Sequence, residues 1–87
     1  MNFKNLSFIA HPNINDAIMA QVICDNGKRV SIVAGTGMYS TSRSGVRQAC
    51  NNVEDALTFE VLIEGEEDVR GWQSREEIDI LLKQNNG

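Results

Sequence analysis

The 87-residue chain has little of the residue types on which the chemistry of small proteins depends. It holds two cysteines, one histidine and one proline. Cys24 and Cys50 cannot build a disulfide scaffold, and because both stand among apolar residues we expect them to be reduced and buried. His11 stands beside Pro12, and although Asp16 is nearby in the sequence, nothing else indicates a catalytic site, so we expect His11 on the surface of a turn.

Long hydrophobic runs are also missing. No apolar stretch approaches the roughly 20 residues of a membrane helix, and the polar N-terminus lacks the apolar segment of a signal peptide. Hydrophobic residues still make up 41% of the chain, which is enough for one modest core. We therefore expect a single domain over residues 1–87, located in the cytoplasm and without membrane contact.

Acidic side chains are scarce in the first part of the chain, and basic side chains are scarce in the second. Residues 1–50 carry five basic and two acidic side chains, whereas residues 51–87 carry three basic and ten acidic ones. A folded domain can intermix these charges. The alternative is an acidic face built by the C-terminal part, which would repel nucleic acid and attract a basic protein surface.

Residues 17–34 predict a β-hairpin, because two β-prone runs flank a turn sequence that ends in Gly27. A two-residue loop would pair Val22 with Ser31. A three-residue loop with Gly27 in the left-handed conformation would pair Val22 with Val30. The second register is favoured because it collects the apolar side chains on one face. That face would hold Ile18, Ala20, Val22, Cys24, Val30 and Ile32.

Two strands and one short helix are expected around this hairpin. Residues 3–10 predict a short strand, and residues 35–45, rich in glycine and serine, predict a loop. Residues 45–53 have apolar side chains at helical spacing and predict a short helix or a helical turn. Residues 57–64 alternate between apolar and polar and predict a strand, whose inward side chains are Leu57, Phe59, Val61 and Ile63.

The C-terminal part predicts a helix. Ser74 is a typical N-cap with Glu77 three residues later as its capping-box partner. The apolar stripe that follows holds Ile78, Leu81 and Leu82. Trp72, just before the cap, is expected to dock this helix on the sheet, and residues 85–87 are expected to fray.

The fold class predicted is α+β: a mainly antiparallel sheet of three to four strands with a C-terminal helix packed on one face. The core should hold the apolar hairpin face together with Phe59, Val61, Ile63, Trp72, Ile78, Leu81 and Leu82.

Two segments are candidate binding surfaces, and no residue is predicted to be catalytic or to bind a metal or cofactor. The acidic run of Glu64, Glu66, Glu67 and Asp68 lacks the alternating ligands of a calcium loop, so it indicates a solvated turn. The Ser-rich loop contributes Tyr39, Arg43 and Arg47. Gly35 and Gly37 match only part of a phosphate-binding loop, since the third glycine and the lysine are missing.

Several segments give the chain a resemblance to small uncharacterised proteins of tailed bacteriophages and prophages. They are residues 27–35 (GKRVSIVAG), 37–39 (GMY), 59–63 (FEVLI), 68–72 (DVRGW) and 74–78 (SREEI). The chain departs from the pattern at Gln73, where those proteins have leucine, and at Ser40, where they have glycine. The resemblance implies an α+β fold and a phage or prophage origin, and it implies no activity.

Together these observations predict a small non-enzymatic accessory protein that binds a protein partner through an acidic surface. The alternative is a small nucleic-acid-binding regulator that uses Arg29 and the basic Ser/Arg loop with Arg43 and Arg47. A sequence pI of about 4.8 disfavours nucleic acid as the partner. A homodimer joined through a sheet edge is compatible with so small a core.

Overall fold

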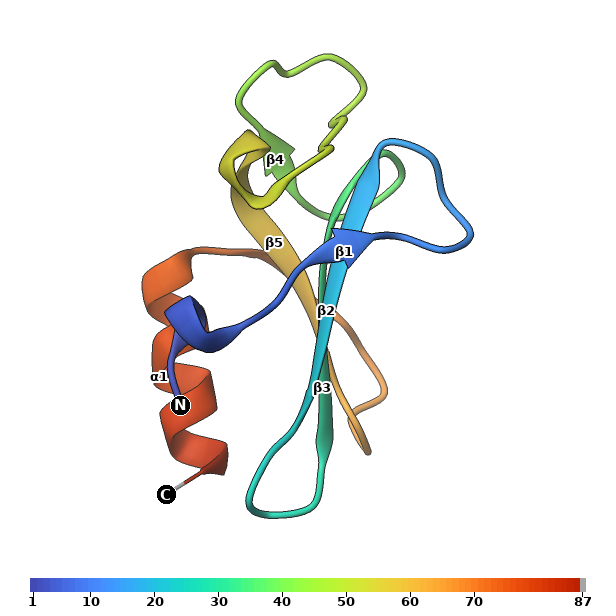
Figure 1. Ribbon diagram of the computed structural model, residues 1–87. Coiled ribbons are helices and arrows are strands. Elements are labelled where there is room, and N and C mark those ends of the chain that lie inside the picture. The colour runs from blue at the N-terminus through green and yellow to red at the C-terminus, as the bar shows by residue number, and fades with distance from the viewer. Residues whose placement is uncertain (87) are drawn as a thin grey trace.

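Three long antiparallel strands form the centre of the sheet in the computed structural model, which describes residues 1–86 (Figure 1). They are β2 (Ala17–Ile23), β3 (Arg29–Gly35) and β5 (Ala56–Ile63). Three short strands complete a six-stranded sheet in which β4 and β6 both pair with β5: β1 (Ile9–Ala10), β4 (Thr41–Ser42) and β6 (Arg70–Gln73). Short 3₁₀ turns occupy Phe3–Asn5 (η1) and Val53–Asp55 (η2), and the single α-helix is α1 (Arg75–Asn85).

The α+β class is confirmed, but the sheet is larger than the predicted three to four strands. The additional strands are short, since β4 has two residues and β6 has four. So short a strand shows no readable alternation of apolar and polar residues, and pairing with a neighbour alone defines it. The expected strand over residues 3–10 is accordingly reduced to β1, with η1 before it.

The hairpin of β2 and β3 has the register of the three-residue loop. Val22 lies opposite Val30, and the Cys24 N–H donates to the Lys28 carbonyl at 2.9 Å. Gly27 takes the left-handed conformation, with φ of 84°. The hydrophobic pattern therefore predicted the register correctly, because a shift by one residue would turn the buried side chains to solvent.

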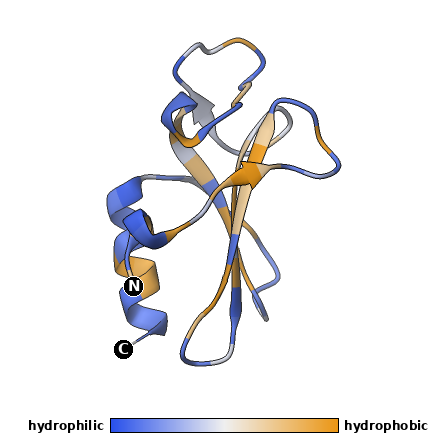
Figure 2. Ribbon diagram, in the orientation of Figure 1, coloured by the Kyte–Doolittle hydropathy of each residue, from blue (hydrophilic) through white to orange (hydrophobic). Residues whose placement is uncertain are grey.

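The core lies between one face of the sheet, which we call the inner face, and α1 together with the N-terminal arm of residues 1–8. Figure 2 shows hydrophobic residues along the central strands and on part of α1. Phe3, Leu6 and Phe8 of the arm pack against the buried cluster. The largest fully buried side chains are Phe59, Ile18, Ile32, Ile78, Leu82, Val30, Val61 and Cys50.

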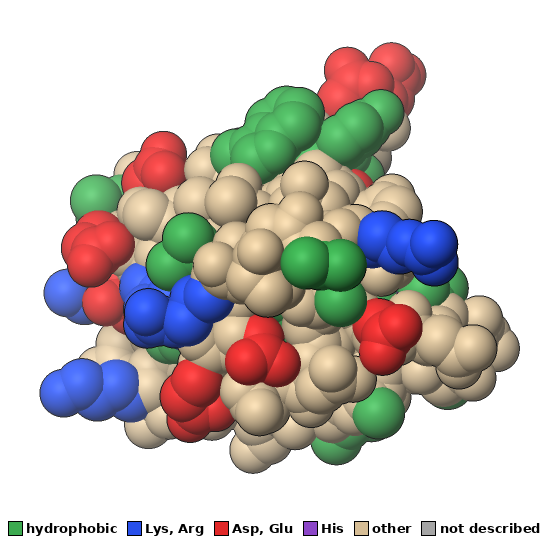
Figure 3. Space-filling model, turned by 90° about the horizontal axis from the view of Figure 1, so that it is seen from above, with side chains coloured by type: hydrophobic (Ala, Val, Ile, Leu, Met, Phe, Trp, Pro, Cys, Tyr) green, Lys and Arg blue, Asp and Glu red, His purple; other side chains and the backbone are tan. Residues whose placement is uncertain are grey.

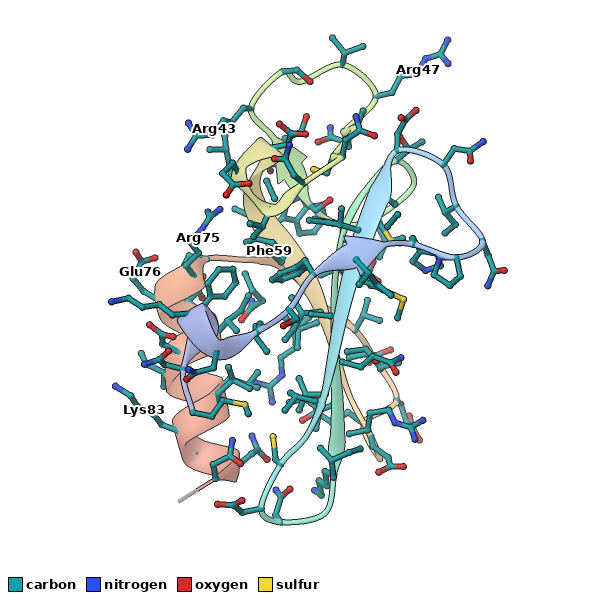
Figure 4. All side chains as sticks on the ribbon, viewed as in Figure 1. Arg43, Arg47, Phe59, Arg75, Glu76 and Lys83 are labelled. Atoms are coloured by element: carbon teal, nitrogen blue, oxygen red, sulfur yellow. The ribbon has the colours of Figure 1, made fainter. Side chains whose placement is uncertain are left out.

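The helix α1 begins as predicted. Ser74 is its N-cap, and the Ser74 hydroxyl accepts from the Glu77 N–H while the Glu77 carboxylate accepts from the Ser74 N–H. Figure 4 shows Glu76 at the start of the helix and Lys83 toward its end, where each charge complements the helix dipole. The predicted stripe is buried: Ile78, Leu81 and Leu82.

Four local expectations were wrong. Trp72 is 58% exposed and lies outside the core. Residues 45–52 form turns and bends before η2 instead of a helix, since Arg47 and Gln48 have φ of 54° and 59°, which no right-handed helix allows. Leu57 is exposed because Ala56 takes the buried position at the start of β5.

The fourth wrong expectation is fraying at the C-terminus. Asn85 and Asn86 are both hydrogen-bonded to the β2–β3 turn. The third residue of that prediction, residue 87, lies outside the described residues.

Candidate functional site

The second face of the sheet, which we call the outer face, carries no helix from residues 1–86. Figure 1 shows α1 on one side of the sheet only. Strand alternation and register place the following side chains on this outer face: Ile9, Met19, Gln21, Ile23, Arg29, Ser31, Val33, Glu60, Leu62 and Glu64. Ile9, Ile23 and Leu62 are among the exposed large hydrophobic residues. An exposed sheet face of this mixed character is a candidate interaction surface.

Two exposed aromatic side chains lie beside this face. The rings of Tyr39 and Trp72 are 5.2 Å apart between centroids at an interplanar angle of 37°. Tyr39 keeps 54% of its surface exposed and Trp72 keeps 58%. A stacked aromatic pair in this geometry stabilises itself by about 0.5–1.5 kcal/mol beyond the area that it buries.

Backbone contacts hold the aromatic pair in place. The Trp72 N–H donates to the Tyr39 carbonyl at 2.8 Å, and the Tyr39 N–H donates to the Glu60 carboxylate at 3.1 Å. Gly71 allows the close approach, because a Cβ at that position would lie 2.9 Å from the Tyr39 Cβ. Hydrogen bonds therefore attach the pair to β5 and β6.

Trp72 is exposed because β6 contains a bulge. Phe59 pairs with Gln73 and Val61 pairs with Arg70, so two residues of β6 stand opposite Glu60 alone. Trp72 takes φ of 51°, a conformation that costs a bulky side chain on the order of 1 kcal/mol. The bulge turns the tryptophan away from the core to which the sequence pattern assigned it.

A shallow hollow of about 230 Å³ lies on the outer face. Within it the Arg29 N–H donates to the Glu64 carboxylate at 3.2 Å, and the Gln21 amide donates to the Ser31 hydroxyl at 3.2 Å. The residues that line it are Gln21, Arg29, Ser31, Leu62 and Glu64. Because the hollow is shallow, it does not suit a buried small molecule.

The four acidic candidate residues are all exposed in or beside the turn between β5 and β6. Glu66 forms an ion pair with Arg70, with 2.8 Å between the Glu66 Oε2 and the Arg70 Nη2. Within residues 1–86, Glu67 and Asp68 form neither an ion pair nor a side-chain hydrogen bond. The acidic turn therefore presents uncompensated negative charge at the end of the hairpin that carries Trp72.

The two basic candidate residues, Arg43 and Arg47, do not lie together. The Arg43 Nε donates to the Glu54 carbonyl, and the Arg43 N–H donates to the Asp55 carbonyl. Arg43 and Arg47 extend from different sides of their loop (Figure 4). Seen from above, basic and acidic side chains are interspersed over that end of the molecule (Figure 3). Arg43 and Arg47 thus form no joint basic patch with each other (Figure 4).

The Ser-rich loop is partly built into the fold. Ser40 and Ser42 are buried, and their hydroxyls accept from the backbone N–H groups of Gly35 and Gly45. Gly35 has a packing role, because a Cβ there would lie 2.4 Å from the Ala17 Cα. These contacts explain the small residues of the loop without a phosphate ligand.

The remaining candidate groups have structural surroundings. The His11 Nδ1 accepts from the Asn13 N–H in a turn. Cys24 and Cys50 are buried and free, as expected. Burial, with a smaller contribution from the negative charge of Asp55, raises the pKa of the Cys50 thiol, so this thiol is poorly suited to act as a nucleophile.

Two further properties concern ions and membranes. Over residues 1–86, no three His, Cys, Asp or Glu side chains come together in a way that could hold a metal ion. The one α-helix among these residues has neither the length nor the apolarity to cross a membrane.

Sequence reasoning missed the aromatic pair as a unit, although it singled out each member. The available signal was the glycine before Trp72, which marks a place in a strand where another part of the chain approaches closely. Comparison with known proteins adds no assignment: no protein-family model, curated protein or solved structure matches this chain.

Proposed function

We propose that this protein is a non-enzymatic accessory protein that binds a protein partner through its outer face. The binding surface consists of the aromatic pair of Tyr39 and Trp72, with the acidic turn at the end of the same hairpin. The resemblance to phage and prophage proteins fits such a role, since that resemblance implies no activity.

The observation that carries the proposal is the exposed, fixed position of Trp72. Its left-handed backbone costs on the order of 1 kcal/mol, and its exposure forfeits much of the stabilisation that burial would give. Strained residues of this kind concentrate at functional sites. Tryptophan and tyrosine are also the residues most often found at the energetic centre of protein interfaces.

The acidic turn supplies the second part of the recognition. Exposed charges at the rim of an interface mainly accelerate association with an oppositely charged surface. We therefore expect the partner to present a basic surface around an apolar pocket that accepts the indole of Trp72.

The nucleic-acid alternative is less well supported. An exposed aromatic pair can stack on bases, but the Glu60 carboxylate accepts a hydrogen bond from Tyr39 itself and Glu64 lies on the same face. These carboxylates would repel phosphates. Salt-dependent binding of single-stranded or duplex DNA at low ionic strength would favour the nucleic-acid alternative over a protein partner.

Substitution of Trp72 by glycine separates binding from folding. Glycine accepts φ of 51° without strain, so Trp72→Gly should keep the free energy of unfolding within about 1 kcal/mol of the wild type. The expected result is loss of the partner from affinity capture. Ile80→Ala is the matched control, because Ile80 is 57% exposed on α1, away from the outer face.

Two outcomes would contradict the proposal. Capture of the same partner with equal affinity by wild type and Trp72→Gly would remove the aromatic pair from the interface. A double substitution of Glu67→Gln and Asp68→Asn that changes neither the association rate nor its salt dependence would remove the acidic turn.

A further inference from the structure

The edge of β2 is only half covered. β1 pairs with β2 at Met19 and Ile18 and then diverges from it. The Cys24 N–H bonds toward β3, and the Ala17 carbonyl accepts from His11 on the opposite side. Because these directions alternate along a strand, the backbone groups of Gln21 and Ile23 point away from β3. Within residues 1–86 no backbone or side-chain group pairs with them.

This open edge lacks the features that usually prevent strand pairing. Natural sheets protect their edges with charged residues, proline, bulges or very short strands. β6 carries Arg70 and a bulge, and β4 has two residues and an irregular register. The segment from Gln21 to Ile23 has no charge, no proline and no bulge, and Ile23 is 58% exposed.

We infer that the β2 edge pairs with the β2 edge of a second copy of this chain. A twofold axis through Val22 would place Gln21 of one copy opposite Ile23 of the other. Both residues direct their N–H and C=O groups outward, so each such pair exchanges two hydrogen bonds. The uncharged segment opposes no like charges across the axis.

The open part of the edge adjoins a hollow. A hollow of about 500 Å³ lies where β1 leaves β2, lined by Ser7, Ile9, Pro12, Met19, Ala20 and Gln21. Antiparallel pairing about Val22 directs the β2–β3 turn of the second copy toward this hollow. A different partner would have to supply an extended segment. A second copy already has one, in which the outward-pointing backbone groups are two residues apart.

The dimer has a consequence for the proposed function. A twofold axis of this kind stands perpendicular to the sheet, so both outer faces point the same way. The two Tyr39–Trp72 pairs would then lie on one side of a continuous sheet, and a partner with two sites would be bound bivalently. This consequence rests on the proposed function, whereas the pairing itself does not.

Sedimentation equilibrium tests the pairing on the intact chain. The pairing involves three residues in each copy, well below a standard interface, so we expect a dissociation constant on the order of 0.1 mM. Ile23→Pro removes the outward N–H without removing a bond to β3, and it should raise this constant at least tenfold. Ile23→Thr keeps the N–H and should stay within about threefold of the wild type. A wild type that is monomeric at about 1 mM would overturn the inference.

Cysteine trapping checks the register. In a Cys24→Ala background, Val22→Cys places two thiols at a non-hydrogen-bonded pair, where Cα atoms about 4.5 Å apart permit a disulfide. Gln21→Cys is the control, since its two copies would be diagonal neighbours roughly 7–8 Å apart. Faster covalent dimerisation of Val22→Cys supports the twofold axis at Val22, and equal rates would exclude it.

Partner binding is read out separately. Trp72→Gly should dimerise like the wild type, and Ile23→Pro should keep the affinity of a single site while losing the gain from bivalency. Failure of the dimer and failure of the proposed function therefore give different results.

Discussion

At the scale of single residues, Arg75 takes a position that the sequence assigned to Trp72. The Arg75 guanidinium lies 5.3 Å from the ring centroid of Phe3 and 5.2 Å from that of Phe59. It also donates to the Val53 carbonyl at 2.9 Å. Figure 4 shows Arg75 at the start of α1 next to Phe59. The Arg75 cation thus packs on two aromatic rings and joins the helix to the N-terminal arm and the sheet. The sequence had led us to expect Trp72 to dock the helix on the sheet.

Substitution of Arg75 measures this contribution. Arg75→Ala should lower the free energy of unfolding by about 1–3 kcal/mol, because a cation–π contact and a charged hydrogen bond are lost together. Arg75→Lys keeps the charge but loses the planar stack, and it should recover only part of the difference. Urea denaturation measures both variants. Equal stability of Arg75→Ala and the wild type would contradict the assignment.

The Cys50 thiol makes stability depend on pH in the alkaline range. Burial raises its pKa in the folded state, so the folded protein holds this proton longer than the unfolded chain does. Its contribution is complete below the unfolded pKa of about 9.0, and it is lost as pH rises toward the folded pKa. The expected slope is at most about 1.4 kcal/mol per pH unit. Urea titrations between pH 7 and 10 should show a steeper fall for wild type than for Cys50→Ala.

At the scale of elements, the end of α1 is joined to the β2–β3 turn. The Asn26 amide donates to the Asn85 side-chain oxygen at 2.7 Å, and the Asp25 N–H donates to the Asn86 side-chain oxygen at 2.9 Å. The Asn86 amide also donates to the Leu82 carbonyl at 2.8 Å, near the end of the helix. These bonds connect segments about sixty residues apart. They hold Asn85 and Asn86 against the β2–β3 turn.

Removal of one asparagine should loosen the turn locally. Asn86→Ala should lower the free energy of unfolding by about 1–2 kcal/mol, since two hydrogen bonds are lost. Hydrogen exchange of the Asp25 amide should accelerate. Gln84→Ala is the control, because Gln84 is exposed on the same helix and forms no side-chain hydrogen bond within residues 1–86. Unchanged exchange at Asp25 would show that the turn holds its conformation without the helix.

At the scale of the whole molecule, the two faces of the sheet differ in how they are covered. The inner face is closed by α1 and by the N-terminal arm, where the rings of Phe3 and Phe8 lie 5.2 Å and 5.6 Å from that of Phe59. The outer face has no such layer within residues 1–86. Packing on the inner face therefore provides the stability of the sheet.

The arm should consequently contribute to global stability. Phe3→Ala should lower the free energy of unfolding by about 2–4 kcal/mol, because a half-buried ring with two aromatic neighbours is lost. Lys4→Ala, in the same turn but exposed, should change it by less than about 0.5 kcal/mol. Thermal unfolding followed by circular dichroism distinguishes the two. Equal melting temperatures for Phe3→Ala and the wild type would show that the arm is dispensable.

Features with a local cause were predictable from the sequence. The hairpin register follows from Gly27 and the alternation on either side of it, and the start of α1 follows from Ser74 and Glu77. The predicted helix over residues 45–53 failed because Arg47 and Gln48 adopt left-handed conformations that nothing in their local sequence requires. Among the candidate site residues, the acidic turn could be located from the sequence, but the pairing of Tyr39 with Trp72 could not.

By itself, the sequence determined which side chains of the central hairpin and of the helix face the core, where the hairpin turns and where the helix begins. Each of these depends on side-chain periodicity or on bonds between residues at most four apart. Tertiary structure alone decided that Trp72 faces solvent, that Arg75 stacks on Phe59, and that the edge of β2 is left open. Those outcomes depend on which strands meet and where a bulge falls between them, and such long-range pairings leave no periodic trace in the chain.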